Sequence, residues 1–330
     1  MMVSMLISLI VMGAVASVFL SSNDTFRRLQ GLATIQDNGR FAISFMKGVF
    51  QGAAYSGCMT TNTIVKNQLT NPNAYANDFT VPLAGYESTG VGVWSPVLDA
   101  VFTTAPAPVP LGGNDIVTVR GAVGPAVNVQ AGMAGLNAAV PISTNHYFAA
   151  TNPILLVSDC GGNADIFQKT NAAAGSAAHA AGPNSSANLS RVYGPGDITV
   201  PIDTTSFYLS TINNINSLVV IQGGQALEMV RGMDGMQILY GVTTATGTGT
   251  SADTSANQYL TAQQVVASAG GWANVVSVRI AMLLSTPNLS VRQPDTRVYQ
   301  LLGVPYGPFN DLRMRQQFET TISLRNRSLQ

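Results

Sequence analysis

The sequence MMVSMLISLIVMGAVASVFLSSND, residues 1–24, is an apolar run with no charge before Asp24. It exceeds the roughly 18 apolar residues that indicate a membrane-spanning helix, and at about 1.5 Å per residue it can cross about 30 Å of hydrocarbon. Three interpretations fit it: a cleaved signal peptide, a single-pass anchor, or a helix that waits in a membrane and then packs against sibling helices in an assembly. Ala14-Val15-Ala16 is compatible with a cleavage site, but the basic start of most signal peptides is missing.

The residues after Leu20 continue the helix with a different pattern. Apolar residues recur at steps of three and four, which places them on one stripe of a helix. Asp24 and Arg28 stand at i,i+4, a spacing at which opposite charges meet on a helix surface. We therefore expect one helix that continues to about Gly52, although Gly31 and Gly39 weaken it locally. The residues expected to pack this stalk on the head are Phe41, Phe45, Val49 and Phe50.

The rest of the chain has the pattern of short strands. Predicted strands rich in Val, Ile, Leu and Tyr cover 115–119, 154–158, 206–210, 217–222, 226–231, 236–242, 275–284 and 317–326. Gly223-Gly224 is typical of a tight hairpin, and the alternation from Phe318 to Leu324 predicts one buried and one solvated face. A short helix is expected after Thr261, with Thr261 as its N-cap. One long helix followed by runs of strands predicts an α+β fold with antiparallel sheet.

We expect two parts: a transmembrane and stalk helix over 1–53, and a β-rich head over 54–330. Two low-complexity stretches, 170–190 and 243–258, are predicted to be mobile loops. The second stretch contains a single acid, Asp253, so it does not predict a calcium site.

The two cysteines, Cys58 and Cys160, suggest a disulfide if the head lies in an oxidising compartment. Such a bond would join the base of the helix to the sheet, whereas the alternative is two unrelated buried thiols. Two thiols and distant histidines do not form a four-ligand zinc set.

The sequence predicts no catalytic residue, no cofactor site and no metal site, so we expect that the protein is not an enzyme. The two histidines, His146 and His179, have no neighbouring acid or nucleophile that suggests a triad. Asp115, Asp159 and Asp165 are interpreted as residues of turns and strand ends rather than as an acidic site.

The charges balance, with 16 basic and 16 acidic residues and a formal net charge of +0, so the whole molecule does not favour nucleic acid. The C-terminal quarter is mildly basic, and we interpret its arginines as solvated sheet edges, with DNA binding as the alternative. These arginines are Arg292, Arg297, Arg313, Arg315, Arg325 and Arg327, against the acids Asp295, Asp311 and Glu319.

Segments along the whole chain together resemble the PilW family of type IV minor pilins. The likeness begins with SSNDTFRRLQGLATIQDNGRFAISFMKGVFQGAAYSGC (21–58) and ends with YGPFNDLRMRQQFETTISLRNR (306–327). Between them it recurs in order at 114–122, 157–167, 230–242 and 275–284. The helix alone would be common to all pilins, whereas the block from Gly39 to Cys58 and the closing Leu-Arg-Asn-Arg are more specific.

The resemblance implies a pilin-like fold and a minor pilin that helps initiate pilus assembly and sits at the filament tip, supporting adhesin display, twitching motility or DNA uptake. Implied partners are other minor pilins, the major pilin and a tip adhesin, with no small-molecule substrate. The implied location is the inner membrane as a single-pass protein with a periplasmic head, and then the cell-surface pilus. Helix-bundle assembly is expected to use Val3, Leu6, Leu9, Ile10, Gly13, Ala14, Val18 and Leu20.

Two alternatives remain open at this point: a minor pseudopilin of type II secretion, and a head that itself binds a surface or DNA. Pilin precursors also carry a short basic leader ending in Gly, then an aromatic residue and a Glu, and this segment is absent here. We expect that the sequence starts late, because the rest of the helix matches.

Overall fold

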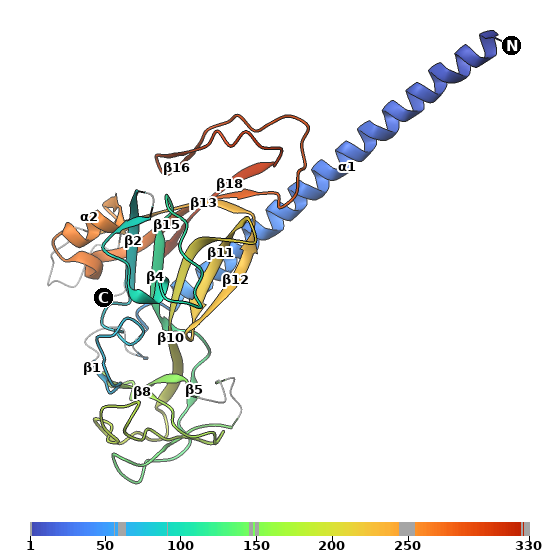
Figure 1. The fold of residues 1–330 in the computed structure, drawn as a ribbon. Helices are drawn as coiled ribbons and strands as arrows, with labels where there is room; N and C mark the ends of the chain where they lie inside the picture. Colours follow the sequence, from blue (N-terminus) through green and yellow to red (C-terminus); the bar gives the residue numbers. More distant parts are fainter. Residues whose placement is uncertain are drawn as a thin grey trace.

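The computed structural model describes residues 2–55, 57–58, 64–90, 92–144, 148, 152–243, 255–324 and 326, with side chains from Ile7 onward. These residues form one long N-terminal helix and a β-rich head from which half of the helix projects (Figure 1). The predicted α+β fold is confirmed.

Helix α1 runs over Met2–Gln51, 50 residues, close to the predicted end at Gly52. Its C-terminal half lies on the head, and steps of three and four bring one face of it inward. The buried residues of that face are Ile35, Gly39, Ala42, Met46 and Phe50.

The larger sheet has ten strands, in the order β1-β8-β7-β10-β4-β2-β3, with β5, β11 and β12 attached through β10 and β11. Its strands are β1 (Ile64–Asn67), β2 (Leu83–Gly90), β3 (Val93–Ser95), β4 (Ile116–Ala122), β5 (Val127–Asn128), β7 (Ile154–Ser158), β8 (Asn163–Gln168), β10 (Ile198–Ile212), β11 (Ile215–Gln222) and β12 (Gln225–Arg231). The long strand β10 organises this sheet, because it pairs antiparallel with β7 near its start and with β4 and β11 farther along.

The smaller sheet has four antiparallel strands in the order β14-β13-β15-β18. They are β14 (Gln258–Leu260), β13 (Met233–Val242), β15 (Val275–Ser285) and β18 (Arg315–Ser323). Short elements complete the described chain: β6 (Val140–Pro141) pairs with β9 (Ser176–Ala177), β16 (Tyr299–Leu301) pairs with β17 (Val304–Tyr306), and η1 (Ala100–Phe102), α2 (Ala262–Ala267) and η2 (Gly271–Asn274) are helical.

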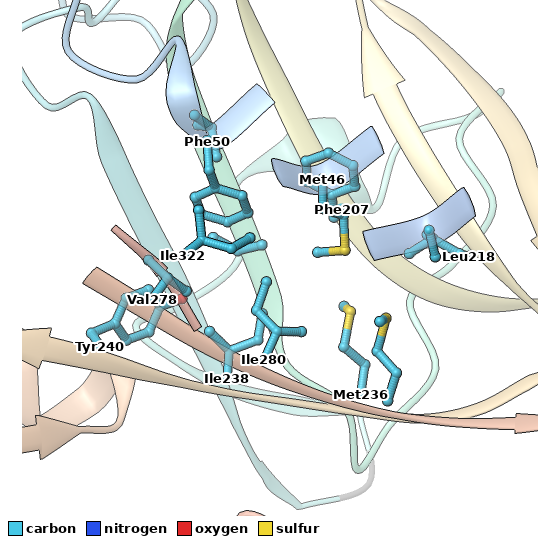
Figure 2. Packing of buried hydrophobic residues seen from close by; sticks show 14 of the residues in the cluster. Met46, Phe50, Phe207, Leu218, Met236, Ile238, Tyr240, Val278, Ile280 and Ile322 are labelled. Atoms are coloured by element: carbon cyan, nitrogen blue, oxygen red, sulfur yellow. The ribbon is translucent and has the colours of Figure 1, made fainter. Parts of the chain in front are cut away.

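The main core lies where α1 meets both sheets. Met46 and Phe50 of α1 contribute to the same buried cluster as Phe207 of β10, Ile238 of β13 and Ile280 of β15. Figure 2 shows the side chains of the helix and the larger sheet facing those of the smaller sheet. Removal of the helix would therefore expose apolar surface on both sheets.

Three local predictions are confirmed. Gly223 and Gly224 form the β11–β12 turn at φ of 58° and 74°, values that glycine adopts without strain. Thr261 caps α2 and accepts a hydrogen bond from the backbone N–H of Gln264. In β18, the side chains from Phe318 to Ile322 alternate between the core and solvent.

The predicted mobile loop at 170–190 is wrong for much of that stretch, because it packs into a second core cluster. Ala177, His179 and Leu189 are buried, and β9 pairs with β6. Both nitrogens of the His179 ring lie at hydrogen-bond distance from backbone oxygens, 2.9 Å from Ala138 O and 3.0 Å from Ala187 O. Small side chains let the backbone approach closely here, which a composition-based prediction of disorder does not capture. Of the second low-complexity stretch, residues 244–254, including Asp253, lie outside the described residues.

Candidate assembly surface

The N-terminal half of α1 exposes apolar side chains on all sides. From Ile7 to Gln30, which we term the protruding segment, every residue is exposed except the half-buried Asp24. Leu9 and Met12 are 74% and 75% exposed, which is unusual for large apolar residues of a soluble monomer. The large apolar side chains exposed on the segment are Ile7, Leu9, Ile10, Val11, Met12, Val15, Val18, Phe19, Leu20, Phe26 and Leu29.

Among the residues whose side chains are described, α1 is the one helix long and apolar enough to cross a membrane. An 18-residue window within Ile7–Gln51 has a mean hydropathy of 1.5, and none of it is buried in the protein. A helix that is apolar all round requires an apolar environment, either lipid or other helices. The segment is therefore compatible with single-pass anchoring.

Six of the eight residues predicted for helix bundling lie on this segment, and Leu9, Ile10, Ala14, Val18 and Leu20 among them are exposed. A Cβ added to Gly13 would meet no atom within 4 Å, so the backbone here is open to a neighbour. The side chains of Val3 and Leu6 lie outside the described residues.

Two hydroxyl groups on the segment, those of Ser17 and Thr25, are satisfied within the helix. Ser17 Oγ donates to Ala14 O at 2.8 Å, and Thr25 Oγ1 donates to Ser21 O at 2.9 Å. Backbone acceptors inside a helix make such hydroxyls tolerable in an apolar environment. Gly13, Ala14 and Ser17 thus form a stretch of small residues that a second helix can approach closely.

The predicted stalk residues meet the head through aromatic contacts. Phe50 is buried and stacks on Phe207 with ring centroids 6.3 Å apart, and Phe45 meets the edge of the same ring at 5.9 Å. Val49 is partly buried against the main core. Phe41 is 49% exposed and its ring stacks on Phe45 at 6.2 Å, so it lies at the margin of the stalk–head contact.

Gly39 marks a close approach between α1 and β18. A Cβ at this position would lie 2.6–2.8 Å from three ring atoms of Phe318 in β18. Such distances are far below ordinary carbon–carbon contact. The glycine that weakens the helix locally is therefore the residue that lets the sheet dock on it.

A segment of the head also reaches the protruding part of α1. Arg292, in the segment between β15 and β18, donates from Nη2 to Leu20 O at 3.2 Å, and its Nε lies 3.3 Å from Asp24 Oδ1. Asp24 Oδ2 pairs with Arg28 Nε at 3.3 Å. The Asp24–Arg28 pair was predictable from its i,i+4 spacing. Arg292 was not predictable as a partner of Asp24, because it is 264 residues from Arg28 in sequence.

The interpretation of the C-terminal arginines as solvated sheet edges is wrong for Arg315. Its side chain is 1% exposed; Nε lies 2.8 Å from Asp234 Oδ2, and Nη1 and Nη2 lie 2.6 and 2.7 Å from the two oxygens of Asp311. Asp295 lies 3.5 Å away, and the guanidinium lies 3.7 Å from the ring centroid of Phe309. The hydrogen bonds from Arg315 lower the pKa of the Asp311 carboxyl. Arg325 and Arg327 lie outside the described residues.

Cys58 and Cys160 form a disulfide, with Cα atoms 4.8 Å apart and a sequence separation of 102. Cys160 lies in the turn between β7 and β8. The bond ties the chain just after α1 to the larger sheet, as the sequence predicted.

The three aspartates weighed as an acidic site each have their own hydrogen-bond partners. Asp159 accepts from the backbone N–H of Gly161 and of Asn163 in its own turn. Asp165 is buried and accepts from the Tyr193 hydroxyl at 2.8 Å.

Asp115 is buried between the sheets and accepts from the backbone N–H of Ile238 at 2.8 Å and of Ser88 at 3.2 Å. Burial, with a smaller effect of nearby Glu87, raises the pKa of the Asp115 carboxyl to about 8. Within the described ranges no three His, Cys, Asp or Glu side chains gather as a metal site. His146 lies outside those ranges.

Comparison with known proteins gives a match to a family model. Neither curated proteins nor solved structures gave a match to the chain. A family model matches from the second half of β10 through β13, β15 and β18, which includes the whole smaller sheet that docks on α1. This supports a role in type IV pilus assembly and confirms the predicted resemblance over that part of the chain. Residues 207–326 match the PilW family, type IV pilus-assembly protein W.

Proposed function

We propose that this protein is a minor pilin that helps initiate type IV pilus assembly and sits at the filament tip. The observation that carries the proposal is the part of the protruding segment from Ile7 to Leu20, which is exposed and carries apolar side chains on all sides. Exposure of so much apolar surface to water is unfavourable, so we infer that lipid or other helices cover the segment.

The segment first lies in the inner membrane, with the head in the periplasm, and then packs among sibling helices in the filament. Exchanging lipid for helices costs little hydrophobic free energy, because lipid tails are as apolar as leucine side chains. Packing then decides the association, and the open backbone at Gly13 beside Ala14 and Ser17 favours close helix approach.

The role is non-catalytic, with other minor pilins, the major pilin and a tip adhesin as partners, and it supports adhesin display, twitching motility or DNA uptake. One observation supports this role over DNA binding by the head. Arg315 is neutralised by the carboxylates of Asp234, Asp295 and Asp311, so the C-terminal quarter is less basic than its composition. A full-length protein in detergent that binds DNA with an affinity that falls steeply with salt would favour the other role.

Site-specific crosslinking tests the proposal. A photoreactive residue introduced at Ala14 or Val18 reports which molecules touch the segment. It requires no added cysteine, so it leaves the Cys58–Cys160 disulfide undisturbed. We expect crosslinks to other pilins in sheared filaments. The control is the same probe at Val97 on the head, where the side chain is 88% exposed and we expect no crosslink to a helix.

The competing roles predict different results. A protein whose segment stays alone in lipid would give lipid adducts only, and a deletion strain with normal pili but failed exoprotein secretion would favour a type II secretion pseudopilin. Either result would contradict the proposal.

A further inference from the structure

We propose that Arg27, Arg28 and Arg292, which we term the collar, bind the phosphate groups of anionic phospholipids where α1 leaves the apolar segment. The inference rests on the proposed membrane location of the protruding segment. It adds a binding site on the head and stalk that faces the lipid surface.

The collar lies at the level where headgroups are expected. The apolar run ends at Asp24, the first charged residue of the helix, so the boundary of the hydrocarbon is expected close to Leu20 and Asp24. Arg292 Nη2 contacts the backbone oxygen of Leu20, which brings a head residue to that boundary. Arg27 and Arg28 follow about 10–12 Å farther along the axis, and helical side chains point back toward the N-terminus, so these long side chains can reach the headgroups.

The charges of the collar are not balanced. Asp24 is the acid that pairs with it, through Oδ1 to Arg292 and Oδ2 to Arg28, so three guanidinium groups share one carboxylate. In the described part of the chain, Arg27 has no carboxylate partner; it lines a crevice of about 380 Å³ between α1 and residues 286–290. A guanidinium has five N–H donors, so most donors of the collar remain available to phosphate oxygens.

The existing ion pairs do not prevent such binding. The side chains of Arg28 and Arg292 are 52% and 61% exposed, and exposed pairs of this kind contribute little to stability. A phosphate can therefore accept hydrogen bonds from Arg28 or Arg292, even in place of Asp24, without a large loss of stability. Arg315 is a contrasting case, because its buried guanidinium is committed to carboxylates of the head.

Native mass spectrometry of the full-length protein in neutral detergent tests the collar. The protein is titrated with dioctanoyl phosphatidylglycerol, with dioctanoyl phosphatidylcholine and with inorganic phosphate. We expect phosphatidylglycerol to bind in preference to phosphatidylcholine. Each arginine near an anionic surface contributes about a fivefold factor in affinity, so Arg27→Gln with Arg292→Gln should weaken phosphatidylglycerol binding about 25-fold.

A matched control removes the same charge elsewhere: Arg191→Gln with Arg279→Gln, two exposed arginines in ion pairs on the head. This variant should keep the preference for phosphatidylglycerol. Equal loss in both double variants, equal binding of the two lipids, or saturation by inorganic phosphate at the same concentration would overturn the proposal.

Carbonate extraction of native membranes separates this inference from the proposed function. A protein that resists extraction but has no phosphatidylglycerol preference would refute the collar and leave the membrane helix standing. A protein that is released by carbonate would refute both.

Discussion

The close approach at Gly39 predicts that one substitution has opposite effects at two positions of the same helix. Alanine is a better helix former than glycine by about 1 kcal/mol, so Gly48→Ala, where an added Cβ meets no atom within 4 Å, should stabilise the protein by up to that amount. At Gly39 the same methyl group would lie 2.6 Å from Cζ of Phe318. The ring would have to move by about 1 Å to restore ordinary contact.

Overpacking of a well-packed site costs about 1–3 kcal/mol. Subtraction of the helix gain leaves Gly39→Ala between neutral and about 2 kcal/mol destabilising, so the two variants should differ by about 1–3 kcal/mol. The assay is denaturant unfolding of the full-length protein in detergent, followed by far-UV circular dichroism. Phe318→Leu in the Gly39→Ala background should recover part of the loss, as a double-mutant cycle would measure.

A Gly39→Ala variant that gains as much stability as Gly48→Ala would refute the predicted clash with Phe318. Additive effects of Gly39→Ala and Phe318→Leu would refute it as well, because they mean that the methyl group and the ring do not meet.

Three further predictions concern buried charge, the disulfide and pH. Arg315→Met should destabilise the head by about 3–5 kcal/mol, as measured by denaturant unfolding, because it leaves buried carboxylates unpaired; a change below 1 kcal/mol would contradict this. Replacing Cys58 and Cys160 together by alanine should cost up to about 4–5 kcal/mol on the loop-entropy estimate for a separation of 102 residues, and reductant should then have no further effect on unfolding. Asp115 has its pKa raised from 3.8 to about 8, chiefly by burial, so the folded state holds a proton that the unfolded chain releases. The stabilisation from this protonated carboxyl is therefore full below about pH 4 and is lost as the pH rises toward 8. The free energy of unfolding should fall by up to about 1.4 kcal/mol per pH unit in this window, and Asp115→Asn should remove that dependence.

The parts of the fold that the sequence predicted depend on contacts between near neighbours. The stripe along α1, the Gly223-Gly224 turn and the alternation in β18 are each set within a few residues, where periodicity and turn chemistry act. The exposed apolar segment of the candidate surface was predictable for the same reason, because its apolar nature follows directly from the residues in it.

The parts that could not be predicted depend on partners far away in sequence. Arg315 and Asp234 are 81 residues apart, and a run of arginines gives no sign of which one will be buried. The segment 170–190 has the composition of a flexible loop, yet it buries His179 against Phe167 with ring centroids 5.3 Å apart. Each small residue buries little apolar area, but small residues allow close backbone packing once a sheet is present.

The glycines of α1 connect the docking of the head to the proposed assembly. Gly31 and Gly39 face the head, where an added Cβ would lie 2.9 Å from Thr286 Cγ2 and 2.6 Å from the Phe318 ring, so their open space is already used. Gly48 is open but stands beside Lys47 on the solvated face. Gly13 is open and lies among apolar residues. The space beside its backbone is therefore available to a neighbouring helix, as the space beside Gly31 and Gly39 is available to the head. A second helix packed against Gly13 would make there the kind of contact that β18 makes at Gly39, and a bulky Gly13→Leu should block assembly while leaving the stability of the head unchanged.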